Sequence, residues 1–180
     1  MRKQWFGMLA VLVSAGIASA ADDVDTQNST VGGTIPELCQ IGIAGDLSGL
    51  LTLTQDGTGE AAYDAGYVES AADATVLTLD ATKQWSLGVN YSGAGWTSPA
   101  PYDKDEADLL IQITNTPTGT VQNNYDSYQT TSNAKTAMLL HNAGVSDNEV
   151  DIQTRVLLDW EQDIPGVYSI TLVYTMETTP

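Results

Sequence analysis

The end of the chain alternates between large apolar side chains and smaller, more polar ones. Residues 166–179 read GVYSITLVYTMETT. Because successive side chains of a β-strand point to opposite faces, one face of an extended segment here would carry Tyr168, Ile170, Leu172, Tyr174 and Met176. The other face would carry Val167, Ser169, Thr171, Val173 and Thr175. The pattern predicts a strand with one face in a hydrophobic core.

Similar short alternating runs recur from residue 37 onward, separated by clusters of Gly, Pro, Asn and Asp. No segment carries a long apolar stripe with helical spacing. The runs predict strands at residues 38–44, 49–55, 66–70, 74–80, 84–91, 107–114, 124–129, 136–141, 149–159 and 166–177. We therefore expect an all-β protein, an antiparallel immunoglobulin-like sandwich of about 8–10 strands.

The alternation also predicts which side chains form the core. We expect inward-facing sets at Trp85, Leu87, Val89 and Tyr91, at Leu109, Ile111 and Ile113, and at Val150, Ile152, Val156, Leu158 and Trp160. The main alternative to an all-strand chain is a single helical turn from Ser132 to Leu140.

The N-terminus has the pattern of a secretory signal peptide. A basic start at Arg2 and Lys3 is followed by an apolar run, and Ala18-Ser19-Ala20 forms a small-residue cleavage site. The alternative is a membrane anchor, but the run is shorter than the ~20 residues a spanning helix needs. We expect residues 1–20 as signal peptide, 21–36 as a flexible arm and 37–180 as the sandwich. This organisation predicts a secreted protein of the extracellular cell surface, with no membrane insertion after cleavage.

The chain is strongly acidic, with a formal net charge of −17. Loss of Arg2 and Lys3 with the signal would leave four cationic side chains against 23 carboxylates. Such a surface repels phosphate backbones and anionic lipid, which disfavours nucleic acid as a partner. The charge either keeps an exported protein soluble or attracts cations and basic partners.

One acidic run is a candidate calcium site. Asp103, Asp105, Glu106 and Asp108 place four carboxylates within six residues, and carboxylate oxygens are ligands that calcium prefers. The run lacks the glycine and the final glutamate of an EF-hand loop, so the alternative is a solvated acidic loop. No other cofactor is expected.

Two further residues, Cys39 and Trp96, are candidates for a specific role. Cys39 is the only cysteine, so an intrachain disulfide is impossible. Its alternation with Ile41 and Ile43 favours a buried thiol over an intermolecular bridge. Trp96 follows a Gly-rich loop, where an indole either contacts carbohydrate or a partner, or caps one end of the sandwich.

Motifs of known catalytic chemistry are missing from the sequence. It has no Gly-x-Ser-x-Gly elbow, no His-Glu-x-x-His and no Cys-x-x-Cys, and His141 is its single histidine. We therefore expect no enzyme. Paired carboxylates for glycoside hydrolysis stay open as an alternative, because such pairs converge in space rather than in sequence.

Two short segments resemble the WxL domain. Trp85-Ser86-Leu87 is similar to the family's first Trp-x-Leu motif, and Tyr168 to Met176 is similar to its closing stretch, with Tyr174 and Met176 in place of Trp and Leu. The resemblance implies an extracellular β-sandwich that attaches bacterial surface proteins to the cell wall. The ending is also similar to those of secreted pilus, spore-coat and filament-forming sandwich subunits.

Three hypotheses of function follow. The first is a noncatalytic subunit of an extracellular filament, fimbria or surface coat, which self-associates or binds other surface proteins when its arm adds a strand to a neighbour's sheet. The second is a module that binds cell-wall glycan or other carbohydrate. The third is a secreted hydrolase that uses paired carboxylates.

Overall fold

The computed structural model describes residues 37–45, 58–93 and 95–178. Contacts divide the chain into residues 1–34 and 35–180, and every described residue belongs to the second unit. The expected signal peptide, the arm at 21–36 and the expected strand at 49–55 lie outside the described residues. No helix in the described part has the length and apolar character needed to cross a membrane.

The described residues form ten strands, one α-helix and one short 3₁₀ helix. The strands are β1 (Cys39–Gly45), β2 (Tyr67–Glu69), β3 (Thr75–Ala81), β4 (Trp85–Tyr91), β5 (Leu109–Ile113), β6 (Thr120–Val121), β7 (Gln129–Thr130), β8 (Thr136–His141), β9 (Val145–Leu157) and β10 (Leu172–Thr178). Helix α1 spans Thr58–Ala65, and the 3₁₀ helix η1 spans Glu106–Asp108.

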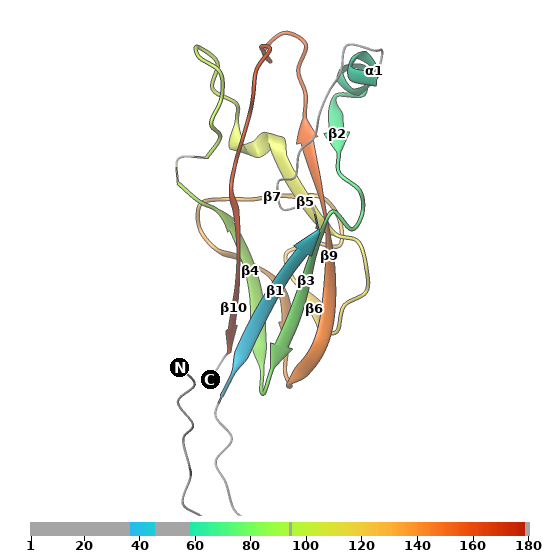
Figure 1. Ribbon diagram of the computed structural model, residues 1–180, viewed down its shortest axis with the longest axis vertical. Helices are drawn as coiled ribbons and strands as arrows, with labels where there is room; N and C mark the ends of the chain where they lie inside the picture. Colours follow the sequence, from blue (N-terminus) through green and yellow to red (C-terminus); the bar gives the residue numbers. More distant parts are fainter. Residues whose placement is uncertain (1–36, 46–57, 94, 179–180) are drawn as a thin grey trace, which may run out of the picture. The chain divides into compact units, whose positions relative to one another are not determined.

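The larger sheet is organised around the long strand β9. Its order is β1-β3-β9-β5-β7, and β2 also pairs with β9. The first part of β9 pairs with β3, while its last residues lie between β2 and β5. Figure 1 shows α1 and β2 beside this last part of β9. All of these pairings are antiparallel.

The smaller sheet has the order β10-β4-β8-β6, also fully antiparallel. In its register Met176 lies opposite Leu87 and Tyr174 opposite Val89. The predicted all-β class is thus confirmed as a sandwich-like fold of two antiparallel sheets with one short α-helix.

Both sheets contribute to one hydrophobic core. Its buried members are Leu77, Leu79, Trp85, Leu87, Val89, Ile111, Ile113, Tyr125, Met138, Leu139, Val150, Ile152 and Met176. The inward faces predicted for β4, β5 and the first half of β9 are therefore largely confirmed. Leu172 and Tyr174 pack against the same core from β10, as the alternation at the chain end predicts.

Two residues expected to be buried are exposed. Trp160 is 59% exposed because β9 ends at Leu157, so the alternation of the strand no longer applies to it. Cys39 shares the alternation of Ile41, which packs against the core, but it lies at the start of edge strand β1 and is exposed. Its thiol makes a long contact of 3.7 Å with the carbonyl oxygen of Met176.

The segments with mixed patterns differ most from expectation. The strand predicted at 136–141 is confirmed as β8, which pairs with β4, so the alternative of a helical turn from Ser132 to Leu140 does not hold. Most of the expected strand at 124–129 is a turn, where Asn123 and Asn124 adopt positive φ angles of 52° and 59°. Left-handed backbone of this kind interrupts an extended chain. Helix α1 was not predicted.

Candidate functional site

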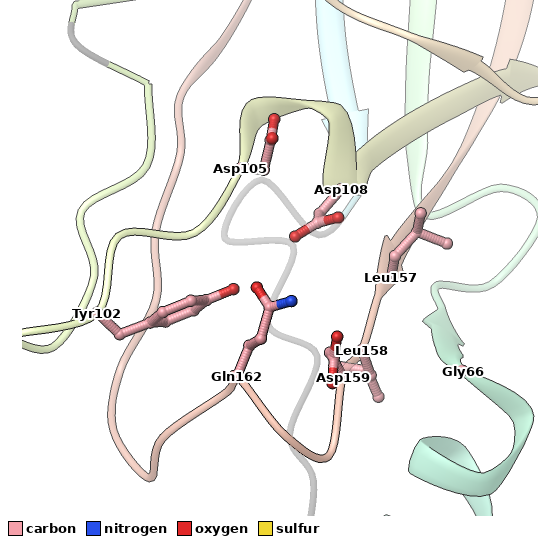
Figure 2. A pocket seen from close by; sticks show the side chains of 8 residues that line it. All are labelled: Gly66, Tyr102, Asp105, Asp108, Leu157, Leu158, Asp159 and Gln162. Atoms are coloured by element: carbon pink, nitrogen blue, oxygen red, sulfur yellow. The ribbon is translucent and has the colours of Figure 1, made fainter.

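A pocket of about 400 Å³ lies where the end of β9 meets the loop that precedes β5. Its lining residues are Gly66, Tyr102, Asp105, Asp108, Leu157, Leu158, Asp159 and Gln162. Figure 2 shows the Tyr102 hydroxyl and the Gln162 amide pointing toward each other, with the Asp108 carboxylate facing the same space. The polar wall of the pocket is therefore made of carboxylates, an amide and a phenol.

The loop before β5 is held by its own hydrogen bonds. The amide of Tyr102 donates to the carbonyl of Pro99 at 3.1 Å, and the amide of Lys104 donates to the Ser98 hydroxyl at 3.1 Å. Asp105 caps η1, since its side chain accepts from the amide of Ala107 at 2.8 Å. Such a cap stabilises the first turn of a helix and here fixes the direction of the acidic run.

The turn after β9 closes on an aspartate side chain. The amide of Asp163 donates to the carbonyl of Asp159 at 3.0 Å, and Asp163 Oδ2 accepts from the amide of Asp159 at 3.1 Å. Asp159 Oδ1 accepts in turn from the amide of Glu161 at 2.8 Å. These bonds hold the Asp163 carboxylate in one orientation.

The loop and the turn meet in a buried ion pair next to the pocket. Lys104 Nζ lies 2.9 Å from Asp163 Oδ1 and 3.3 Å from Asp108 Oδ2. The side chains of Lys104 and Asp163 are only 3% and 2% exposed. Burial lowers the pKa of the Lys104 amine, but the hydrogen bond to Asp163 and the charge of Asp108 outweigh burial and leave the pKa raised.

Tyrosine rings surround this ion pair. The Lys104 amine lies 5.9 Å from the centre of the Tyr168 ring, which meets the Tyr102 ring edge-on at 6.3 Å. The Tyr168 hydroxyl donates to the carbonyl of Ile164 at 2.7 Å and accepts from its amide at 3.0 Å. Burial and the nearby Asp163 charge raise the pKa of Tyr63. The ion pair thus lies in a protected, largely aromatic environment.

The exposed ring of Trp160 lies on the same turn, beside Tyr63 of helix α1. Trp160 stacks on Tyr63 with a ring separation of 4.7 Å, and its indole N–H donates to Asp64 at 3.2 Å. Because Trp160 lies between pocket residues Asp159 and Gln162 in the chain, the turn presents an apolar ring close to polar groups. Tryptophan is enriched at interfaces because it combines a large apolar ring with a polar N–H.

The predicted calcium ligands do not converge. Asp105 and Asp108 both line the pocket, but Asp105 is used as a helix cap and Asp108 contacts Lys104. Asp103 and Glu106 are not among the lining residues. Within the described ranges, no three His, Cys, Asp or Glu side chains are arranged to hold a metal ion. Calcium binding stays a prediction.

The remaining predicted residues lie elsewhere. Trp96 is half-buried, and its indole N–H is buried without a partner among the described residues. Trp85, Leu87 and Met176 are buried in the core, and Tyr174 packs against it. Burial also raises the pKa of Tyr174 above its ordinary range. The four WxL-like residues therefore meet between β4 and β10, where they stabilise the smaller sheet.

Sequence reasoning missed the Lys104–Asp163 pair and the pocket beside it. The two residues are 59 positions apart, so only the pairing of distant strands brings them together. The available signals were a lysine inside an acidic run and the repeated aspartates at 159 and 163. Neither signal specifies the partner.

A second charged cluster lies on the outer face of the larger sheet. The Arg155 guanidinium lies 4.2 Å from the centre of the Tyr67 ring and 3.9 Å from that of Tyr128. Its Nε donates to Glu69 at 2.7 Å. Burial, together with the neighbouring Glu69 carboxylate, raises the pKa of Tyr128 to about 12. This cluster ties β2, β9 and the segment before β7 together.

In the described structure, β1 and β7 are the end strands of the larger sheet, and β10 and β6 are the end strands of the smaller sheet. Among the described strands, β1 pairs only with β3 and β10 pairs only with β4. Strands β1 and β10 also contact each other across the two sheets, and Figure 1 shows them side by side. Ile43 on β1 is 51% exposed, Leu38 just before β1 is 58% exposed, and Val173 is exposed on β10.

Comparison with known proteins identifies no relative. No protein-family model matches the chain, and no curated protein matches it. Its function is therefore inferred from its own surfaces.

Proposed function

We propose that this chain is a noncatalytic, secreted structural subunit of an extracellular filament, fimbria or surface coat. In this proposal one copy adds a strand to an open sheet edge of the next copy, and residues 21–36 donate that strand. The observation that carries the proposal is the character of edge strand β1.

The residues of strand β1 itself include none of the types that usually protect a sheet edge. Its seven residues, CQIGIAG, include no charged side chain and no proline. Natural edge strands are commonly protected by lysine, proline, bulges or a covering segment, because unpaired backbone groups recruit another strand. Nor does the pairing of β1 with β3 contain a register shift. An unprotected apolar edge is suited to strand addition.

The expected signal peptide and the missing catalytic motifs support the same proposal. A secreted chain with one cysteine and no reaction motif has no evident chemistry to perform on a substrate. Assembly would also cover Leu38 and Ile43, which a monomer leaves exposed.

Electron microscopy and analytical ultracentrifugation of the purified protein test this proposal. We expect filaments or large oligomers from the unmodified chain, and loss of assembly on deletion of residues 21–36 or on Ile43→Lys. The matched control is Val167→Lys, because Val167 is 83% exposed but lies outside the strands. A stable monomer at all concentrations, or assembly unaffected by both changes, would contradict the proposal.

The alternative is a cell-wall or carbohydrate-binding module, consistent with the WxL resemblance. The favouring observation is Trp160, which exposes its ring on the turn that also contributes Asp159 and Gln162 to the pocket. A pull-down on peptidoglycan and common polysaccharides tests it. Retention that is lost on Trp160→Ala but kept on Trp96→Ala supports this alternative, and failure to bind any glycan refutes it.

A further inference from the structure

We propose that Lys104 and Asp163 condense to form an intramolecular isopeptide bond, with Asp108 relaying a proton. The bond would join the loop before β5 to the turn after β9. This modification goes beyond the proposed assembly and does not depend on it, because all three residues belong to one copy.

The reacting groups are already positioned for the reaction. Lys104 Nζ lies 2.9 Å from Asp163 Oδ1, and both side chains are almost fully buried. Each is carried by a segment held by its own hydrogen bonds, so little further ordering is needed before reaction. Fixing two reactants in contact raises their effective concentration by many orders of magnitude.

The atoms and protons balance without an added reagent. The ammonium of Lys104 and the carboxylate of Asp163 together carry three protons. The Nζ–Cγ bond forms, the Cγ–Oδ1 bond breaks, and Oδ1 leaves as water with two of these protons. The third proton stays on the new amide nitrogen. No oxidant, reductant or activated co-substrate is consumed.

Two neighbouring groups assist this step. Asp108 Oδ2 lies 3.3 Å from Lys104 Nζ, so it can accept a proton from the amine and return it to the departing oxygen. The amide of Asp159 donates to Asp163 Oδ2 at 3.1 Å, and Oδ2 is the oxygen that stays in the product. A fixed N–H donor at this oxygen stabilises the negative charge that develops during attack.

Formation of the amide also removes the electrostatic cost of burying two charged side chains. A buried ion pair must compensate for the loss of hydration of two charges, whereas a secondary amide is neutral. The raised pKa of Lys104 keeps its amine protonated before reaction, so Asp108 must take up a proton before the amine can attack. Since Cys39 is the only cysteine, no intrachain disulfide competes for the role of covalent link.

Mass spectrometry of the folded protein tests the proposal. We expect the intact chain to be lighter than its processed sequence by one water molecule, and protease digestion to release a branched peptide joining Lys104 to Asp163. Lys104→Arg keeps the positive charge but cannot form this amide, so this variant should show its full mass. Lys135→Arg is the control, because Lys135 forms an exposed ion pair with Glu177 and its loss should leave the missing water unchanged.

A second variant tests the proton relay. Asp108→Asn should leave the folded chain intact and lower the cross-linked fraction at least tenfold, which the ratio of the two masses measures. If Asp108→Asn cross-links like the unmodified chain, the relay is wrong. If the folded unmodified chain shows its full mass, the isopeptide bond is refuted, whether or not the chain assembles.

Discussion

Arg155 on β9 links the paired strand β2 to the segment before β7, which is not paired with β9. Its guanidinium lies between the Tyr67 and Tyr128 rings and pairs with Glu69. A planar guanidinium can stack on two rings while donating hydrogen bonds in its own plane, whereas an ammonium cannot. The contact therefore depends on arginine specifically and not on positive charge alone.

We predict that Arg155→Lys lowers the free energy of unfolding by about 1–2 kcal/mol, since it keeps the charge but loses the stacking. Denaturation in urea, followed by fluorescence, measures the change. Lys83→Ala is a suitable control, because Lys83 is half-buried but its partner Glu37 is largely exposed, so the pair should contribute less than about 1 kcal/mol. Equal effects of the two substitutions would show that stacking on the tyrosines adds nothing.

The turn between β8 and β9 packs closely against a neighbouring backbone. A Cβ added at Gly144 would lie 2.8 Å from the carbonyl oxygen of Ala81 and 3.1 Å from the carbonyl carbon of Thr82. Both atoms belong to backbone, so neither can rotate away. The close approach of this turn to the end of β3 therefore requires glycine.

Gly144→Ala should destabilise the protein by about 1–3 kcal/mol, because the β8–β9 and β3–β4 turns must separate. Thermal unfolding followed by circular dichroism would record the loss. Gly42→Ala is the matched control, since its added Cβ would meet Thr78 at an ordinary 3.8 Å. A Gly144→Ala variant as stable as Gly42→Ala would contradict this account.

The elements that sequence predicts best are those with one buried face. Strands β4, β5 and β10 alternate strictly, and the structure confirms the faces they bury, but β10 begins at Leu172 and not at Gly166 as predicted. Helix α1 lacks such a signal, since its eight residues, TGEAAYDA, include glycine and two acidic residues. Its apolar side chains are too few to form a clear helical stripe, so its state depends on tertiary contacts.

The candidate site could be predicted only in part. The acidic run and the unusual position of Lys104 within it are visible in the sequence, and the structure places Asp105 and Asp108 at the pocket. The partnership with Asp163 requires the pairing of β5 with β9, which places the preceding loop against the following turn. Local spacing does not contain that information, because it arises from strand order.

At the scale of the whole molecule, the charges are distributed unevenly. All four cationic side chains in the described residues form ion pairs with carboxylates. The remaining carboxylates therefore lack a lysine or arginine partner among the described residues, and two approaching copies repel each other. Repulsion between exposed charges extends over about 10 Å at 0.1 M salt and much farther at low salt.

Assembly of the purified protein, if it occurs as proposed, should accelerate as salt rises from about 0.01 M to about 0.15 M, because screening shortens the range of this repulsion. Light scattering against time gives the rate. The Ile43→Lys variant should stay unassembled at every salt concentration. This control distinguishes the screening of charge repulsion from the loss of the apolar edge of β1. Assembly that slows with added salt would indicate attraction between opposite charges instead.

The scarcity of lysine has a practical consequence for handling the molecule. Lys104 is inaccessible, so amine-reactive dyes or coupling resins would find only Lys83 and Lys135 on the described surface. Both neighbour the smaller sheet, Lys83 just before β4 and Lys135 just before β8. Immobilisation through them would present the molecule in a narrow set of orientations and leave the pocket beside Tyr102 chemically unlabelled.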